Sequence, residues 1–143
     1  MVTEAPREAE VSGLPLWRRV AVVLIGWPLA AFFGFVGWHK ATATMAQLAT
    51  YHAWTAHVPE WIGRPIGWLE MVTAVALLAA ISQRIWPMAR WLVMVVAATQ
   101  FVSSAIHLQR GEASFIAQNV VLVAGLAAFF WLTRPTPQKE QKP

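Results

Sequence analysis

The sequence predicts an all-α integral membrane protein, built as a four-helix bundle. Its 143 residues are 57% hydrophobic and 13% charged, whereas soluble domains average about 45–50% and about 25%. So few charged side chains cannot cover a water-facing surface. Four apolar segments also follow one another, each near the ~20 residues that cross ~30 Å of hydrocarbon. The basic residues lie beside these segments, as in loops that flank membrane spans, and this distribution excludes nucleic acid as the partner.

The expected spans are residues 20–37, 66–81, 91–106 and 115–132. They are expected to be helices because open strand edges would leave backbone groups unpaired in lipid. Gly26, Pro28 and Gly34 predict a kink in the first span. That span exceeds the 7–15 apolar residues of a signal peptide and lacks a small-residue cleavage site, so we interpret it as a mature helix. Residues 1–16 and 134–143 form polar tails around a bundle at 17–133.

The basic residues predict the orientation of the bundle. Eight Lys and Arg residues lie on the side of the two termini and three on the other. Cytoplasmic loops carry the excess of Lys and Arg, so both termini are expected in the cytoplasm of a bacterium, with the bundle in the inner membrane. Tryptophans stand at the span ends, where rings of this kind anchor helices at the interface: Trp17, Trp38, Trp61, Trp86, Trp91 and Trp131.

One long connection joins the first two spans, from residue 38 to residue 65. Its middle, residues 42–57, places Met45, Leu48 and Trp54 among small polar residues, and Pro59 ends it. This pattern predicts a short helix that either lies on the outer surface or folds back between the spans.

A few polar residues interrupt the apolar segments, and each is expensive in lipid unless it has a partner or a function. In the third span Gln100, Ser103, Ser104 and His107 fall at i, i+3, i+4 and i+7, which places them on one helix face. With the predicted orientation, all the notable polar positions gather in the outer half of the bundle. The candidate ligand-binding residues are Lys40, Glu70, Gln100, Ser103, His107 and Asn119.

Several interpretations of this polar cluster remain open. Lys40 could pair with Glu70, while Gln100 and Asn119 could make hydrogen bonds that hold helices together. The same groups could instead line a pocket for the head group of a small amphipathic ligand. A haem or metal bound through His39 and His107 has no support from spacing, since neither HExxH nor a carboxylate pair near a His is present. The absence of Cys excludes disulfides, thiol nucleophiles and Cys-bound metal centres.

Rows of small residues predict close helix packing. Gly26, Ala30 and Gly34 form a row on the first span, and Ala124 and Ala128 form another on the fourth. Such rows let backbones approach closely. The partner is either another span of this chain or a second copy in a homo-oligomer.

Short motifs at the ends of the first two spans resemble those of the DoxX-like family of small four-helix bacterial membrane proteins. The family pattern is G-x-x-K, a loop with G-x-P, then I-G-x-x-E-L. Here GWHK ends at Lys40, Val58-Pro59 occupies the loop, and IGWLE ends at Glu70, followed by Met71 in place of Leu. The similarity extends over about residues 20–132, and it maps the family's shared Lys and acidic positions onto Lys40 and Glu70.

The resemblance implies a role in quinone-linked thiosulfate oxidation, in redox-stress complexes of the membrane, or in transport or chaperone-like functions. Without Cys or a recognisable cofactor motif, the chain is expected to act as an accessory subunit beside other membrane subunits, with no covalent cofactor and no catalysis alone. Its ligand would be a quinone or a similar amphipathic molecule. The competing hypothesis is a scaffold that docks a partner protein. A small-solute transporter is a third hypothesis, although no inverted repeat is visible.

Overall fold

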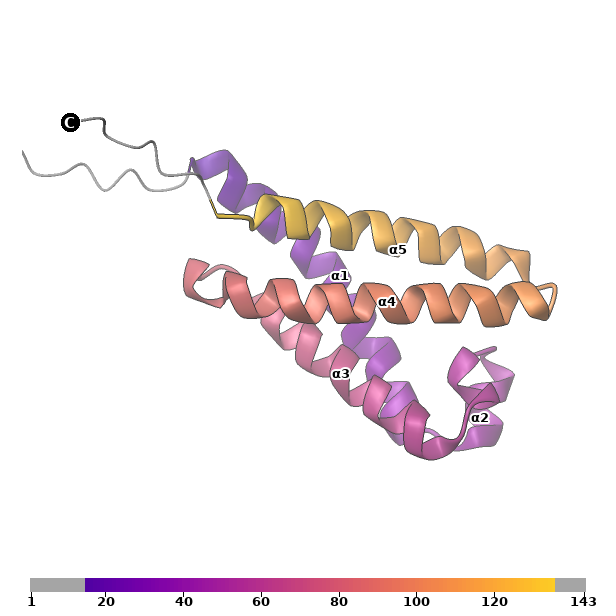
Figure 1. Cartoon of the computed structure of the whole chain (residues 1–143). Helices are drawn as coiled ribbons and strands as arrows, with labels where there is room; N and C mark the ends of the chain where they lie inside the picture. The colour runs from indigo at the N-terminus through magenta and orange to yellow at the C-terminus, as the bar shows by residue number, and fades with distance from the viewer. Residues whose placement is uncertain (1–14, 136–143) are drawn as a thin grey trace, which may run out of the picture.

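The computed structural model describes residues 15–135 and contains only helices in that range (Figure 1). The elements are α1 (Leu16–Thr42), α2 (Met45–Thr50), η1 (Trp54–His57), α3 (Glu60–Ala79), η2 (Gln83–Ile85), α4 (Trp86–Gln109) and α5 (Ala113–Leu132). The long helices α1, α3, α4 and α5 are each long and apolar enough to cross a membrane. The all-α prediction with four candidate spans is therefore confirmed. The tails assigned to residues 1–16 and 134–143 fall almost entirely outside the described residues.

The long helices begin and end at different residues from the predicted spans. Helix α1 continues to Thr42, and α3 begins at Glu60 and passes through Pro65. Hydropathy locates apolar runs, whereas a helix also continues through polar residues that keep its backbone hydrogen bonds. In the first turn of α3, Arg64 Nη2 donates to Glu60 Oε1 over 2.6 Å, an i,i+4 pair that supports the helix ahead of the proline.

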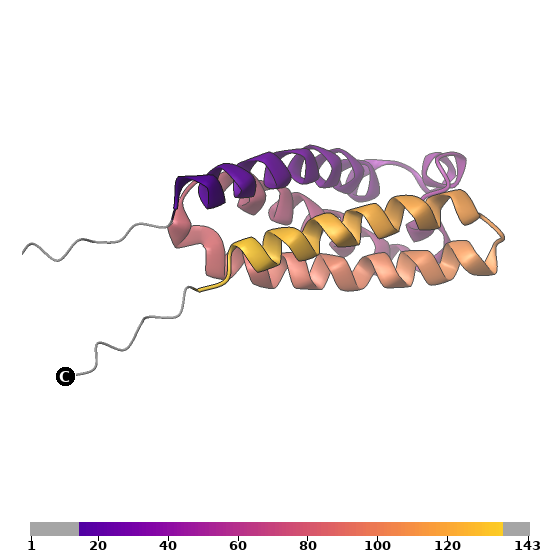
Figure 2. The ribbon, with the colours of Figure 1, turned by 90° about the horizontal axis from the view of Figure 1, so that it is seen from above.

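The four long helices form two closely packed pairs. Helices α4 and α5 run side by side, whereas α1 and α3 run obliquely to them and diverge toward the end where α2 lies (Figure 1). The view from above shows the long helices running along one common direction (Figure 2). The start of α1 and the end of α5 lie at the opposite end from α2 (Figure 2).

Two glycines set the contact between α1 and α3. A Cβ atom on Gly67 would lie 2.6 Å from the backbone nitrogen of Ala41, and one on Gly37 would lie 2.7 Å from the carbonyl oxygen of Gly67. Glycine is therefore required at both positions for this approach. The predicted row on α1 does pack inside the chain, with Gly26 beside Phe129, but its tightest contact lies farther along at Gly37.

On α5 the predicted small-residue row does not make the close helix contact within the chain. Ala124 is exposed, whereas Gly125 faces Leu29 on α1, with a built Cβ at 3.3 Å from the leucine Cδ2. One position along a helix rotates a side chain by about 100°. Two alanines four residues apart show that one face of the helix carries short side chains. They do not show that this face is the one that packs against a neighbouring helix.

The buried side chains are apolar in one half of the bundle and mainly polar in the other. The half near the start of α1 is filled by apolar side chains, with Phe33, Leu77, Val96, Leu126 and Phe129 each at most 1% exposed. At the other half the buried positions of the long helices are glycines and polar residues, among them Lys40, Glu70, Gln100 and Asn119. Exposed large apolar side chains cover the outside of the helices, as expected where helices face lipid.

Arg18 and Trp86 are buried at the chain-end side, and Trp86 thereby departs from its predicted place at the interface. Arg18 is 8% exposed, and its guanidinium donates to the carbonyl oxygens of Leu132 and Arg134 at the end of α5. Trp86 is 5% exposed and donates Nε1–H to Ala80 O over 2.9 Å, so it is a core residue. The other five tryptophans assigned to span ends are exposed.

Candidate functional site

A cavity of about 510 Å³ lies in the polar half, where α1 diverges from α4 and α5. Aromatic and aliphatic side chains form one part of its wall, and buried polar side chains form the other. Its lining residues are Phe32, Phe35, Val36, His39, Lys40, Leu48, Tyr51, His52, Ala53, Trp54, Glu70, Gln100, Ser103, His107, Phe115, Gln118 and Asn119.

The connection between α1 and α3 forms one part of the wall of this cavity, from Leu48 to Trp54. It forms two short helices in place of the single predicted one. Thr44 and Gln47 make a reciprocal capping box that starts α2, and His52, with φ of 52°, adopts the left-handed conformation that separates α2 from η1. Leu48 and Trp54 are 2% and 4% exposed. These two side chains turn inward, while the other residues of α2 are exposed or half-buried.

Lys40 and Glu70 form the predicted pair at the centre of the cavity wall. The distance from Lys40 Nζ to Glu70 Oε1 is 2.5 Å, and the two residues are 5% and 0% exposed. They meet because Lys40 follows Gly37 by three residues on α1, and Glu70 follows Gly67 by three on α3. Because the two helices are antiparallel, Lys40 lies level with Gly67 and Glu70 lies level with Gly37: a Cβ on Gly67 would lie 2.9 Å from Lys40 C, and one on Gly37 would lie 2.9 Å from Glu70 Cβ. The ion pair therefore forms diagonally across the glycine contact.

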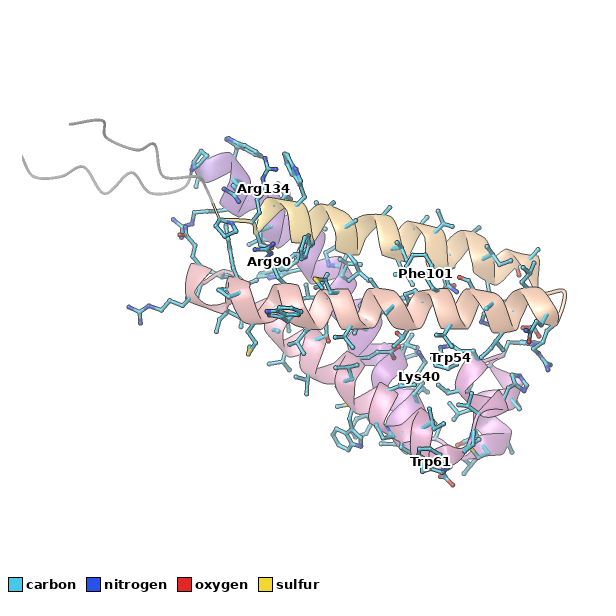
Figure 3. The ribbon with its side chains drawn as sticks, viewed as in Figure 1. Lys40, Trp54, Trp61, Arg90, Phe101 and Arg134 are labelled. Carbon is cyan, nitrogen blue, oxygen red and sulfur yellow. The ribbon has the colours of Figure 1, made fainter. Side chains whose placement is uncertain are left out.

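Trp54 and Arg64 complete the surroundings of Lys40. The Lys40 ammonium lies 5.5 Å from the centre of the Trp54 ring, within the range of a cation–π contact, and Figure 3 shows the two residues near each other below α4. Arg64 Nη1 donates to the carbonyl oxygens of Lys40 and Ala43 over 3.1 and 2.6 Å, so it caps the end of α1. The sequence does not indicate these contacts with Lys40, because both residues lie in the connection or at its edge, outside the apolar segments.

The predicted polar face of α4 is present. Gln100, Ser103 and His107 are 4%, 3% and 4% exposed, while Ser104 is half-buried beside them. Asn119 on α5 donates from Nδ2 to Ser103 Oγ and Ser104 Oγ over 3.0 and 3.1 Å. Gln100 has only long contacts to its own helix, 3.4 Å to Thr99 Oγ1 and 3.5 Å to Val96 O. Its amide therefore retains hydrogen-bonding capacity in the cavity wall.

A carboxylate in the turn between α4 and α5 holds the cavity histidine. His107 Nδ1–H donates to Glu112 Oε2 over 2.7 Å, and the imidazole stacks on Phe115 with ring centres 4.7 Å apart. Glu112 Oε1 also lies 3.3 Å from His52 Nδ1. The hydrogen bond from His107 is the main cause that lowers the pKa of Glu112 to about 2. Since Nδ1 is occupied, Nε2 is the ring nitrogen of His107 available to a ligand.

Glu112 was missed because it lies outside the apolar segments that were searched for polar residues. The available signal was Gly111, whose φ of 71° makes the sharp turn that returns the acidic residue to the end of α4. His39 also lines the cavity, with Nδ1 2.9 Å from Phe35 O. Among the described residues, no group of three or more His, Asp or Glu is arranged to hold a metal ion.

All six residues predicted to bind a ligand line this one cavity. They come from all four long helices, and they are Lys40, Glu70, Gln100, Ser103, His107 and Asn119. Comparison of the chain with models of known protein families, with curated proteins and with solved structures gave no match. The functional conclusion therefore depends on the geometry, which can accommodate a molecule with an apolar body and a hydrogen-bonding head group.

Proposed function

We propose that the chain is a DoxX-like accessory subunit of a quinone-linked redox system in the bacterial inner membrane, and that its cavity holds the quinone head group. The observation that supports this proposal is the combination of an aromatic wall with buried polar groups in one cavity of about 510 Å³. The family motifs add support, because Gly37, Lys40 and Glu70 from these motifs belong to one helix contact and one ion pair.

The polar groups suit quinone chemistry. Reduction of a quinone consumes two protons, and His107, with Glu112 behind it toward the loop, can supply one at the head group. Lys40 can stabilise negative charge that develops on the ring oxygens. The chain has no Cys and therefore no thiol or iron–sulfur centre, so we assign the supply of electrons to a partner subunit.

We infer that the termini face the cytoplasm and that the cavity lies in the outer half of the membrane. Among the described residues, Arg18, Arg19, Arg84, Arg90 and Arg134 lie toward the chain-end side of the bundle. The opposite end carries Lys40, Arg64 and Arg110. Because short cytoplasmic loops carry the excess of basic residues, the end that contains α2 is assigned to the outside.

A scaffold that docks a partner protein is the second candidate function. The bonds from Asn119 to Ser103 and Ser104 join α5 to α4, and the Lys40–Glu70 pair joins α1 to α3. Such contacts stabilise a bundle without any ligand. Gln100 distinguishes the two functions, because its buried amide makes no hydrogen bond to another helix.

The test is extraction of ligand from the protein purified in mild detergent. Mass spectrometry of the extract should find about one quinone per chain. The Gln100→Leu variant should lose bound quinone and keep its unfolding temperature, and Phe101→Leu, a lipid-facing change on the same helix, should alter neither. Phospholipid as the only extracted molecule, together with a lower unfolding temperature for Gln100→Leu, would indicate the scaffold.

A further inference from the structure

The ion pair in the cavity wall leaves one carboxylate oxygen without a partner. Glu70 is 0% exposed, and its Oε1 accepts from Lys40 Nζ over 2.5 Å. Its Oε2 is buried and has no hydrogen-bond partner among the described residues. A buried carboxylate oxygen without a donor is strongly destabilising. The site is therefore complete only when something in the cavity donates a hydrogen bond to Oε2.

The charges around Glu70 determine which donors fit. Lys40 already neutralises the carboxylate at 2.5 Å, so a cationic donor would meet a buried positive charge of the same sign. A neutral O–H or N–H group avoids that repulsion. A carbonyl or ether oxygen is excluded at this position because it can only accept, as Glu70 Oε2 itself does.

A second buried atom without a partner lies beside Lys40, and it is a hydrogen-bond donor, whereas Glu70 Oε2 is an acceptor. Trp54 Nε1 is a buried donor without an acceptor among the described residues, and the Trp54 ring lies against Lys40 Nζ. The indole N–H accepts nothing and donates to any oxygen. This part of the cavity therefore presents one acceptor that selects for O–H and one donor that does not discriminate between ligand oxygens.

We propose that the cavity recognises a neutral hydroxyl group, which donates to Glu70 Oε2. The inference rests on the proposed quinone function, for which it means that the reduced quinol binds more tightly than the oxidised quinone. The quinol carries hydroxyl groups where the quinone carries carbonyl oxygens. A hydrogen bond to a charged acceptor corresponds to about tenfold or more in affinity.

The experiment measures dissociation constants for two matched pairs of probes on the full-length protein in nanodiscs, under anaerobic conditions. One pair is a decyl-tailed benzoquinone and its quinol. The other is 4-nonylphenol and its methyl ether, which differ only in the hydroxyl donor. The quinol and the phenol should each bind about tenfold more tightly than their partners.

Two variants test whether the preference for a hydroxyl group comes from Glu70 or from Trp54. Glu70→Gln keeps an oxygen for Lys40 and places an amide donor at the position of Oε2, so the preference for hydroxyl should disappear or reverse. Trp54→Phe keeps the ring beside Lys40 and removes the N–H. Both members of each pair should then bind more weakly, with their ratio unchanged.

The outcomes separate this inference from the proposed function. Equal binding of quinone and quinol, and of phenol and ether, would overturn the hydroxyl inference while leaving a quinone site. Tighter binding of the phenol than of its ether, with neither quinone form bound, would support the inference and reject the quinone. If no probe binds above the level of empty nanodiscs, both proposals are wrong. The two probe pairs on the unmodified chain decide these outcomes even if Glu70→Gln fails to fold.

Discussion

Glu112 is a single residue that contacts two histidines and an arginine at the end of the cavity near the loop. Its carboxylate accepts from His107, lies 3.3 Å from His52 and accepts from Arg110 Nε over 3.2 Å. The side chain is 17% exposed, so it lies where the buried histidine meets the loop. This arrangement keeps the carboxylate ionised at neutral pH and fixes the orientation of the His107 ring.

The first prediction concerns stability in acid. The pKa of Glu112 is about 2 in the folded protein, against an ordinary value of 4.5, chiefly because of the hydrogen bond from His107. A carboxylate whose pKa is lowered by folding stabilises the fold fully above its unfolded pKa. That contribution should be lost as the pH falls from about 4.5 toward about 2. Thermal unfolding in detergent across this range measures it.

The matched variant is Glu112→Gln. It should unfold at a lower temperature than the wild type at pH 7, and the difference should shrink toward pH 2, where the wild-type carboxylate takes up a proton. Glu60→Gln is the control, because its side chain is 59% exposed and pairs with Arg64 instead of a histidine. An equal pH dependence for wild type and Glu112→Gln would contradict the assignment.

At the scale of elements, the contact between α1 and α3 positions the site. The two glycines bring the backbones together, and the Lys40–Glu70 pair forms across this contact, with Lys40 level with Gly67 and Glu70 level with Gly37. Arg64 fixes the end of α1 from α3 through the carbonyl oxygens of Lys40 and Ala43. Helix spacing and the geometry of the ion pair are therefore coupled.

The second prediction tests this coupling with Gly67→Ala. The new Cβ would lie 2.6–2.9 Å from backbone atoms of Gly37, Lys40 and Ala41, which cannot move without separating the helices. Overpacking of this kind destabilises by about 1–3 kcal/mol, and bound ligand should be lost with it. Unfolding temperature and extracted ligand are the measurements.

Gly34→Ala is the matched control on the facing helix. Its Cβ would lie 3.6 Å from Ala74 Cβ, an ordinary van der Waals contact, so stability should be unchanged or slightly higher. Equal tolerance of both alanines would show that the glycine contact does not set the helix spacing.

At the scale of the whole molecule, the bundle has two unlike ends. One half is packed with apolar side chains and ends at Arg18, whose guanidinium caps α5. The other half contains the cavity, and residues of α2 and η1 form part of the cavity wall. Helix α2 lies at this end of the bundle (Figure 1). In the proposed orientation, ligand and protons exchange at the outer face, while the packed half separates the cavity from the cytoplasm.

The third prediction tests that orientation with single cysteines, which the absence of native Cys makes unambiguous. A membrane-impermeant maleimide added to intact cells should label Ala46→Cys on α2 and leave Gln83→Cys on η2 unlabelled. Both positions are exposed, so both should react once detergent opens the membrane. Labelling of Gln83→Cys alone in intact cells would place the cavity on the cytoplasmic side.

The number of long helices, one buried helix face and several cavity residues could be predicted from the sequence, because each depends on residues that are close together along the chain. The number of long apolar helices follows from hydropathy, which is summed over neighbouring residues. The buried face that carries Gln100, Ser103 and His107 follows from helical periodicity, which is also local along the chain. Six of the residues that line the cavity could be predicted because polar groups in apolar segments are rare and expensive.

The tertiary structure decided what depends on contacts between distant residues. Gly37 meets Gly67, Trp54 approaches Lys40, and Glu112 returns to His107 through the turn at Gly111. The unpartnered Glu70 Oε2 is likewise defined only by everything packed around it. Hydropathy and periodicity describe one helix at a time. Which faces meet is determined by the joint packing of four helices, in which a shift of one residue turns a side chain by about 100°.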